Sequence, residues 1–227
     1  MKAITSDGPS AGIESMSVRI ADALNAGRSV LWLVCGGSNV AAAVAAMERI
    51  HALAEPGAIE LLTVGLTDER YGPVGHADSN WQQLVDAGLN LRKVSAMPVL
   101  IGRSLEATVV DYAERLERKL GDIRSTGGLV VALFGIGADG HIAGALPGSP
   151  AALEQKKLVV GYRSDTFVRI TIAPVVFGRI DVAYALVFGA SKKAALERLT
   201  GGDLPIAEQP AQLLKQVPEA WLYSDCV

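Results

Sequence analysis

The stretch LVVALFGIGADGHIAG, residues 129–144, decides the fold and carries the residues with the clearest chemistry. It begins with an uninterrupted apolar run, residues 129–134, which is typical of a β-strand buried on both faces. Three glycines in residues 135–140 then allow the backbone to turn sharply and to approach a ligand closely. Ligands of open α/β sheets bind at the carboxyl ends of the strands. Asp139 and His141 therefore stand where such a sheet does chemistry, although Asp139 is equally suited to cap a helix.

Outward from this stretch, strand and helix patterns alternate along most of the chain. Further strand patterns cover residues 30–35, 59–66, 97–101, 168–172, 183–188 and 220–223. Helix patterns cover residues 13–24, 39–53, 81–87, 104–120, 174–181, 191–199 and 207–215. Residues 1–12 read as a loose start, and no repeat or linker divides the chain. We predict one α/β domain over residues 1–227, with a mainly parallel sheet and helices on both faces, a Rossmann-like, doubly wound arrangement. The sequence does not give the order of the strands in this sheet.

The composition is that of a globular protein, since 50% of the 227 residues are hydrophobic and 20% are charged. A net charge of -3 does not suggest a nucleic-acid partner. No apolar run reaches the ~18 residues of a membrane span, and the first 20 residues lack the apolar core of a signal peptide. Two cysteines, Cys35 and Cys226, make no disulfide framework. We therefore expect a cytoplasmic protein with neither a nucleic-acid nor a membrane partner.

Three other strand ends carry residues suited to binding an anion. Gly37 and Ser38 follow the first strand and offer backbone N–H and hydroxyl donors at the start of a helix. The run TDER, residues 67–70, follows the second strand, and the guanidinium of Arg70 can donate two parallel hydrogen bonds to a phosphate. Lys192 lies at the start of a later helix, where a cation opposes the helix dipole. Each pattern by itself is also typical of a tight turn or a solvated loop.

His141 is the histidine best placed for catalysis, because it follows a buried strand and a glycine-rich turn. Histidine titrates near neutral pH and can take a proton from water. His51 lies late in a helix, and His76 lies in a loop where it could line a site. No set of His, Cys and Asp residues has the spacing of metal ligands, so we expect no bound metal.

Taken together, these stretches resemble the 6-phosphogluconolactonase family, within the larger group that includes glucosamine-6-phosphate deaminase. The matching pieces follow the family's order: GGS at 36–38, TDERYGPVGHADSN at 67–80, FGIGADGHIAGALPG at 134–148, RITIAP at 169–174 and GASKKAAL at 189–196. The deaminase group has DEY where this chain has DER, and it carries a glutamate at the position of Leu146. The resemblance therefore favours the lactonase branch. That branch usually reads close to HTASLFP after DG, whereas here Gly144 takes the serine position and Leu146 the phenylalanine position.

The resemblance implies hydrolysis of 6-phospho-D-glucono-1,5-lactone to 6-phosphogluconate in the pentose phosphate route. A lactone is an activated ester, so water and a general base suffice, and no metal or organic cofactor is needed. His141 would take the proton from water, and Asp139 or Asp68 would orient the imidazole or the sugar hydroxyls. Backbone N–H groups around Gly137 and Ala138 would face the developing oxyanion. The phosphate would be held by Gly37, Ser38, Arg70 and Lys192, with Arg169 as a further candidate.

Two alternatives stay open from the sequence. One is a deaminase-like isomerase, which Arg70 and Leu146 disfavour. The other is a non-catalytic sugar-phosphate-binding protein, which the intact run Asp139-Gly140-His141 disfavours. In each case the expected partner is a small sugar phosphate, and the expected assembly is a monomer or a small homo-oligomer.

Overall fold

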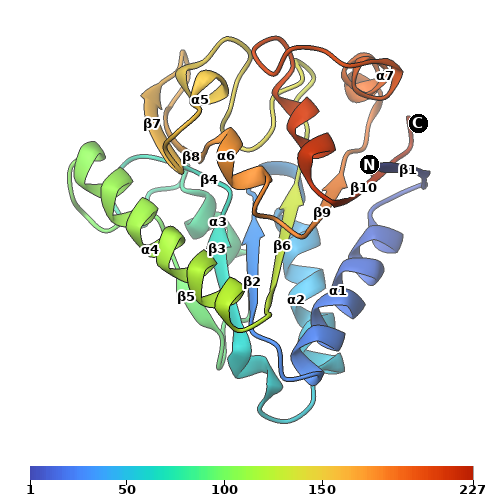
Figure 1. The fold of residues 1–227 in the computed structure, drawn as a ribbon, viewed down its shortest axis with the longest axis vertical. Coiled ribbons are helices and arrows are strands. Elements are labelled where there is room, and N and C mark those ends of the chain that lie inside the picture. The colour runs from blue at the N-terminus through green and yellow to red at the C-terminus, as the bar shows by residue number, and fades with distance from the viewer. Residues whose placement is uncertain (227) are drawn as a thin grey trace.

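A seven-stranded parallel sheet forms the centre of the computed structural model, which describes residues 1–226 (Figure 1). The strand order is β1-β10-β9-β6-β2-β3-β5, and every neighbouring pair is parallel. The strands are β1 (Lys2–Thr5), β2 (Val30–Val34), β3 (Leu62–Leu66), β5 (Ser95–Met97), β6 (Leu129–Phe134), β9 (Val182–Leu186) and β10 (Glu219–Ser224). Because the strands run the same way, the loops after their carboxyl ends meet at one edge of the sheet.

The inner strands are continuously apolar because helices cover both faces of the sheet. Every residue of β2, β3, β6 and β9 is buried. Helices α1 (Ser10–Asn25) and α2 (Val40–Leu53) pack together, and Figure 1 shows them on the opposite side of the central strands from α4 (Leu105–Ser125). Two-sided burial of this kind is what uninterrupted apolar strand patterns predict.

A second, antiparallel sheet of three strands lies beside the upper ends of the parallel strands in Figure 1. Its order is β4-β8-β7, with β4 at Asp68–Arg70, β7 at Val159–Arg163 and β8 at Val168–Ile172. The register between β4 and β8 places Arg70 opposite Arg169. The other α-helices are α3 (Asn80–Asp86), α5 (Pro150–Leu153), α6 (Pro174–Phe177) and α7 (Lys193–Gly201), and 3₁₀ helices cover Gly37–Asn39, Ala58–Leu61, Ala190–Lys192 and Pro210–Gln216.

The predicted α/β class and mainly parallel sheet are confirmed, while several elements differ from the prediction. Residues 2–5, expected as a loose start, form edge strand β1 on β10. Residues 68–70 form strand β4 instead of a loop, and 159–163 form a strand that was not predicted. Strand 168–172 exists but belongs to the antiparallel sheet. The helix expected at 207–215 is a 3₁₀ helix that begins at Pro210.

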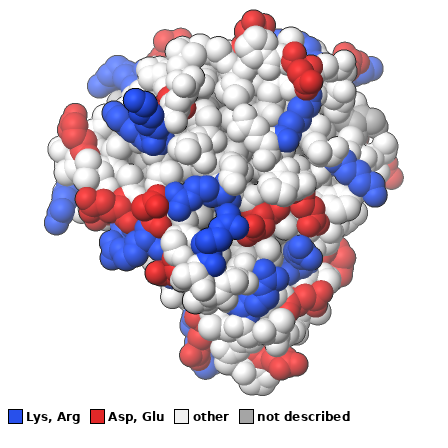
Figure 2. Space-filling view, in the orientation of Figure 1, with Lys and Arg blue, Asp and Glu red and all other residues white. Residues whose placement is uncertain are grey.

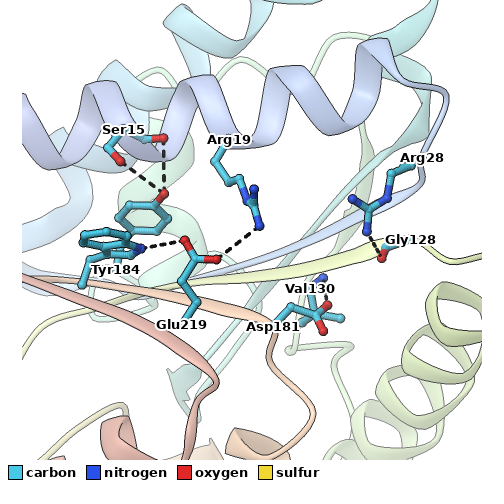
Figure 3. Close-up of polar contacts among 9 residues, drawn as sticks. Ser15, Arg19, Arg28, Gly128, Val130, Asp181, Tyr184 and Glu219 are labelled. Carbon is cyan, nitrogen blue, oxygen red and sulfur yellow. Dashed lines mark hydrogen bonds and ion pairs between the residues drawn. The ribbon is translucent and has the colours of Figure 1, made fainter. Parts of the chain in front are cut away.

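Polar contacts fasten α1 to the sheet on the side shown in Figure 3. The hydroxyl of Tyr184 in β9 lies 3.3 Å from the hydroxyl of Ser15 in α1. Arg19, one turn further along α1, donates a hydrogen bond of 3.2 Å to the carboxylate of Glu219 in β10. These contacts fix α1 against β9 and β10, the strands that precede two of the chain's C-terminal segments.

Charged side chains of both signs are interspersed over the face of the molecule seen in Figure 2. Basic groups near the centre of this face lie beside acidic ones, in keeping with the small net charge of -3. Among residues 1–226, none of the helices combines the length and the apolar character that a membrane crossing demands.

Candidate active site

A cleft of about 340 Å³ opens where the loops after the parallel strands meet. Of the residues predicted for catalysis and phosphate binding, all but Asp139 line this cleft: Gly37, Ser38, Asp68, Arg70, His141, Arg169 and Lys192. Of the two residues expected to supply oxyanion donors, Gly137 lines the cleft and Ala138 does not. They come from the loops after β2 and β6, from β4 and β8, and from the 3₁₀ helix before α7. The fold thus brings together residues that are more than 150 positions apart in the chain, from Gly37 to Lys192.

His141 and Asp139 form a hydrogen-bonded pair in the turn after β6. Asp139 Oδ1 lies 2.6 Å from His141 Nδ1 and also accepts the backbone N–H of His141 at 3.1 Å. The hydrogen bond from the His141 ring lowers the pKa of Asp139 to about 2, so this carboxylate is ionised at neutral pH. With Nδ1 held by a carboxylate, Nε2 is the ring nitrogen that can accept a proton. The pair has the geometry of a general base that is oriented by a carboxylate.

Gly137 makes room for this pair. A Cβ atom at this position would overlap the His141 ring and the Asp139 carboxylate. The N–H of Gly137 donates to the carbonyl of His141 at 2.9 Å, which closes the turn. Gly137 is therefore not the oxyanion donor expected from the sequence, because its N–H is already engaged. The N–H of Ala138 has no hydrogen-bond partner among the described residues and stays a candidate for that role.

Asp68 lies in the cleft without touching His141. Its side chain is buried, and its carboxylate accepts hydrogen bonds from Thr67 Oγ1 at 3.0 Å and from Asn80 Nδ2 at 3.2 Å. The carboxyl group next to the imidazole is thus that of Asp139, while Asp68 faces the cavity from β4. This arrangement suits Asp68 to bind a hydroxyl group of a ligand.

Glu69, the next residue along β4, points away from the cleft and organises the loop beneath it. Its buried carboxylate accepts hydrogen bonds from the backbone N–H groups of Arg70, Asn80 and Trp81 and from the hydroxyl of Ser79. Burial raises the pKa of Glu69, and the four donors oppose that rise. The carboxylate therefore ties β4 to the first turn of α3.

Three cationic side chains, those of Arg70, Arg169 and Lys192, line the cleft. Arg70 Nη1 donates to the carbonyl of Asp78 at 3.0 Å, and Arg169 Nε donates to Ser164 Oγ at 3.3 Å. These contacts leave guanidinium donors of both arginines for a ligand, since each group carries five N–H bonds. An anionic ligand is the natural occupant of this part of the cleft.

Gly144, which departs from the family pattern, is packed tightly against β8. A Cβ atom here would lie 2.8 Å from Thr171 Cβ and 3.2 Å from Asp68 Cβ. The N–H of Gly144 donates to Thr171 Oγ1 at 2.9 Å, and its carbonyl accepts the hydroxyl of Tyr162 at 2.6 Å. Thr171 thus fills the space that a serine side chain at 144 would need. Leu146, the other departure, does not line the cleft.

Sequence reasoning missed several residues of the cleft, Asn80 and Cys35 among them. Asn80 follows the helix-capping residue Ser79, so its position indicated only a helix start. Its Oδ1 atom is buried and has no hydrogen-bond partner among residues 1–226. Burial raises the pKa of Cys35 to about 12, which makes it a thiol and a poor nucleophile. His76, expected as a possible lining residue, instead contacts the carbonyl of Arg70 at 3.0 Å.

Within residues 1–226, no group of three or more His, Cys, Asp or Glu side chains is placed to hold a metal ion. The chemistry that the cleft offers on its own is that of a His–Asp pair, buried polar acceptors and three cations.

The chain is similar in sequence to known proteins. A sequence model of the family described as glucosamine-6-phosphate isomerases/6-phosphogluconolactonase matches residues 10–222. The 6-phosphogluconolactonase of Caulobacter vibrioides is 31% identical over 172 residues, which are 68% of this chain and 67% of that protein. That of Mycobacterium bovis is 27% identical over 209 residues, covering 86% of this chain and 82% of the relative.

The fold agrees with solved structures as well. A crystal structure of a 6-phosphogluconolactonase from Shewanella baltica superposes with a TM-score of 0.76 at 20% identity, covering 98% of this chain and 97% of that one. The Thermotoga maritima structure of the same name gives a TM-score of 0.76 at 16% identity and the same coverage. The chain belongs to the glucosamine-6-phosphate isomerase/6-phosphogluconolactonase family and is an enzyme of that family.

Proposed function

We propose that this enzyme hydrolyses 6-phospho-D-glucono-1,5-lactone to 6-phosphogluconate, a step of the pentose phosphate pathway. The observation that carries the proposal is the Asp139–His141 pair, which faces a cleft lined by three cationic side chains. The names of the relatives from Caulobacter vibrioides and Mycobacterium bovis support the same substrate. The cytoplasmic location and the small homo-oligomer or monomer expected from the sequence stay predictions.

In the proposed mechanism, His141 is the general base. Asp139 holds Nδ1–H, so Nε2 takes a proton from a water molecule while the water oxygen attacks C1 of the lactone. The carbonyl oxygen becomes an oxyanion, for which the N–H of Ala138, unpaired among the described residues, is a candidate donor. When the bond between C1 and the ring oxygen breaks, the imidazolium returns the proton to that oxygen. The product is the open-chain acid, which carries a carboxyl group at C1 and a hydroxyl group at C5.

Substrate orientation comes from the opposite, phosphate-bearing end of the sugar. Arg70, Arg169 and Lys192 bind the phosphate, together with Ser38 and the backbone of Gly37 at the start of the helix after β2. The carboxylate of Asp68 and the unpartnered Oδ1 of Asn80 accept hydrogen bonds from sugar hydroxyl groups. Binding the remote phosphate holds C1 near His141, which lowers the entropic cost of the attack.

The decisive experiment follows opening of freshly made 6-phosphogluconolactone and subtracts the spontaneous rate. We expect the purified protein to accelerate ring opening and to release no ammonia from glucosamine 6-phosphate, because the position of the deaminase glutamate is Leu146. Ammonia release at a rate similar to lactone hydrolysis would overturn the proposal in favour of the isomerase activity. The absence of both activities, with sugar-phosphate binding intact, would identify a non-catalytic binding protein.

A further inference from the structure

Two arginines of the cleft are arranged in a way that costs stability in the free protein. In the antiparallel pair β4–β8, Arg70 lies directly opposite Arg169. Like charges that face each other across two strands repel, so such a pair destabilises a sheet. Neither arginine forms an ion pair with a carboxylate among the described residues. Something other than an acidic side chain therefore holds the two guanidinium groups together.

The aromatic ring of Phe167 contacts both of them. Arg70 Cζ lies 5.1 Å from the centre of this ring, and Arg169 Cζ lies 5.6 Å from it. Both distances fall within the range in which the negative face of an aromatic ring attracts a cation. One ring thus makes cation–π contacts with two guanidinium groups from different strands.

The position of the ring is itself fixed by the turn between β7 and β8. Ser164 N–H donates to the carbonyl of Phe167 at 2.8 Å, and Ser164 Oγ donates to the same carbonyl at 2.9 Å. The serine hydroxyl oxygen also accepts from Arg169 Nε at 3.3 Å. Turn, ring and arginine therefore form one unit, which packs against Arg70 on the neighbouring strand.

Arg70 carries a second sign that it is arranged for a ligand. Its Nε atom is buried and has no hydrogen-bond partner among residues 1–226. An unpaired buried donor on a charged group is unfavourable unless a ligand supplies the acceptor. Both arginines line the cleft, whereas Phe167 does not. The ring thus acts on a ligand only through the two guanidinium groups.

We propose that Phe167 is a positioning residue that holds Arg70 and Arg169 as a two-arginine clamp for the phosphate dianion of the substrate. The proposal rests on the lactonase function proposed above and deepens it, because it assigns the selection of phosphorylated over unphosphorylated lactone to this unit. A dianion removes the repulsion between the two arginines, and the ring keeps them close enough to bind it together. The clamp belongs to the β4–β8 pair and the hairpin turn, not to the catalytic turn after β6.

The test replaces the ring and measures binding separately from turnover. Phe167→Leu keeps an apolar side chain but removes both cation–π contacts, and Phe167→Tyr keeps the aromatic face. We expect the leucine variant to bind 6-phosphogluconate about tenfold more weakly by calorimetry and to show a similar rise in KM for the phosphorylated lactone, with kcat nearly unchanged. The tyrosine variant should stay near wild type, as should the control Thr166→Ala in the same exposed turn.

Two further measurements show whether the ring acts through the arginines. Use of unphosphorylated gluconolactone should be unaffected by Phe167→Leu. In a background that carries Arg70→Ala and Arg169→Ala, the leucine substitution should cause no additional loss. If Phe167→Leu unfolds, Phe167→Met, which has a longer apolar side chain, takes its place in every arm.

Unchanged 6-phosphogluconate binding in Phe167→Leu would overturn the clamp. An equal loss for both lactones would also overturn it, as would a further loss in the background that carries Arg70→Ala and Arg169→Ala. Failure of the proposed function gives a different result. A wild-type protein that binds 6-phosphogluconate with this dependence on Phe167, yet hydrolyses no lactone, would refute the lactonase and leave the clamp standing.

Discussion

At position 141, a general base must accept a proton, whereas a structural residue needs only to make a hydrogen bond. His141→Asn separates the two roles, because asparagine keeps hydrogen-bonding groups but cannot take a proton near pH 7. We expect the catalysed rate of lactone opening to fall by about 10²–10⁴. The melting temperature and the affinity for 6-phosphogluconate should change little, since the ring is partly exposed at the cleft.

His51→Asn is the matched control for this substitution. Its ring contacts the carbonyl of Asn90 at the surface, outside the cleft, so the variant should keep full activity. A His141→Asn protein that folds normally and retains more than about a tenth of the wild-type rate would exclude the general-base role. The water would then need another activator, and Asp139 would be the first to examine.

The pH dependence of the rate follows from the carboxylate beside this ring. The pKa of Asp139 is lowered to about 2, so its ionised form and the pairing that depends on it persist until the pH falls through that value. An acid limb of kcat/KM at higher pH must therefore come from a group other than Asp139. Asp139→Asn should lower kcat/KM by at least about tenfold, because the His141 ring loses the carboxylate that holds its Nδ1 atom. An Asp139→Asn variant with the wild-type kcat/KM would contradict this role.

At the scale of single elements, Glu69 links β4 to α3 through the four hydrogen bonds that its carboxylate accepts. The carboxylate of Glu69 offers two acceptor oxygens, whereas the amide of Gln offers one. In Glu69→Gln, buried N–H groups at the start of α3 therefore lose their partner. We expect a loss of roughly 2–4 kcal/mol in the free energy of unfolding, measured by urea denaturation. KM for the phosphorylated lactone should rise as well, since Arg70 follows Glu69 directly in the strand.

Glu60→Gln provides the comparison for that substitution. Glu60 pairs with Lys93 at 3.0 Å, but both side chains are more than half exposed, at 57% and 54%. Exposed pairs of this kind contribute about 0–1 kcal/mol, so this variant should unfold almost like wild type. Equal losses in the two variants would show that the four donors around Glu69 are not worth more than a surface contact.

The elements that sequence predicted well are those whose signal is local. Strands β2, β3, β6 and β9 are buried on both faces, and their apolar runs show this without knowledge of their neighbours. The strand β4 has the sequence Asp-Glu-Arg, which by composition favours a loop, and it becomes a strand only through pairing with β8 about 100 residues later. Edge strand β1 was missed for the same reason, because its pairing partner is β10 at the other end of the chain.

The candidate site divides in the same way. Asp139 and His141 lie in one turn after one strand, so their proximity could be predicted from a short stretch of sequence. Phe167 acts through two arginines that the fold brings to it, and nothing in its own surroundings in the sequence marks it. The engaged N–H of Gly137 also depends on the closed turn, which spacing alone does not reveal.

At the scale of the whole molecule, the parallel sheet collects cations from distant segments around one cavity. Lys192 lies beyond β9, and Arg70 follows β3, yet both side chains line the cleft with His141. A charge-assisted hydrogen bond contributes roughly 1.5–3 kcal/mol, which corresponds to tenfold or more in affinity. Lys192→Ala should therefore weaken use of the phosphorylated lactone by about tenfold or more and leave use of unphosphorylated gluconolactone nearly unchanged.

The neighbouring lysine supplies the control for this last prediction. Lys193 carries the same charge one residue later, but its side chain is 64% exposed, lies 3.9 Å from Glu197 and does not line the cleft. Lys193→Ala changes the net charge of the protein as Lys192→Ala does, so any effect of overall charge on the encounter with an anionic substrate appears in both variants. A specific phosphate contact predicts a large change in KM for Lys192→Ala alone. Equal changes in the two variants, or an equal loss with both lactones, would mean that Lys192 does not bind the phosphate and that the cations of this edge act only through their long-range field.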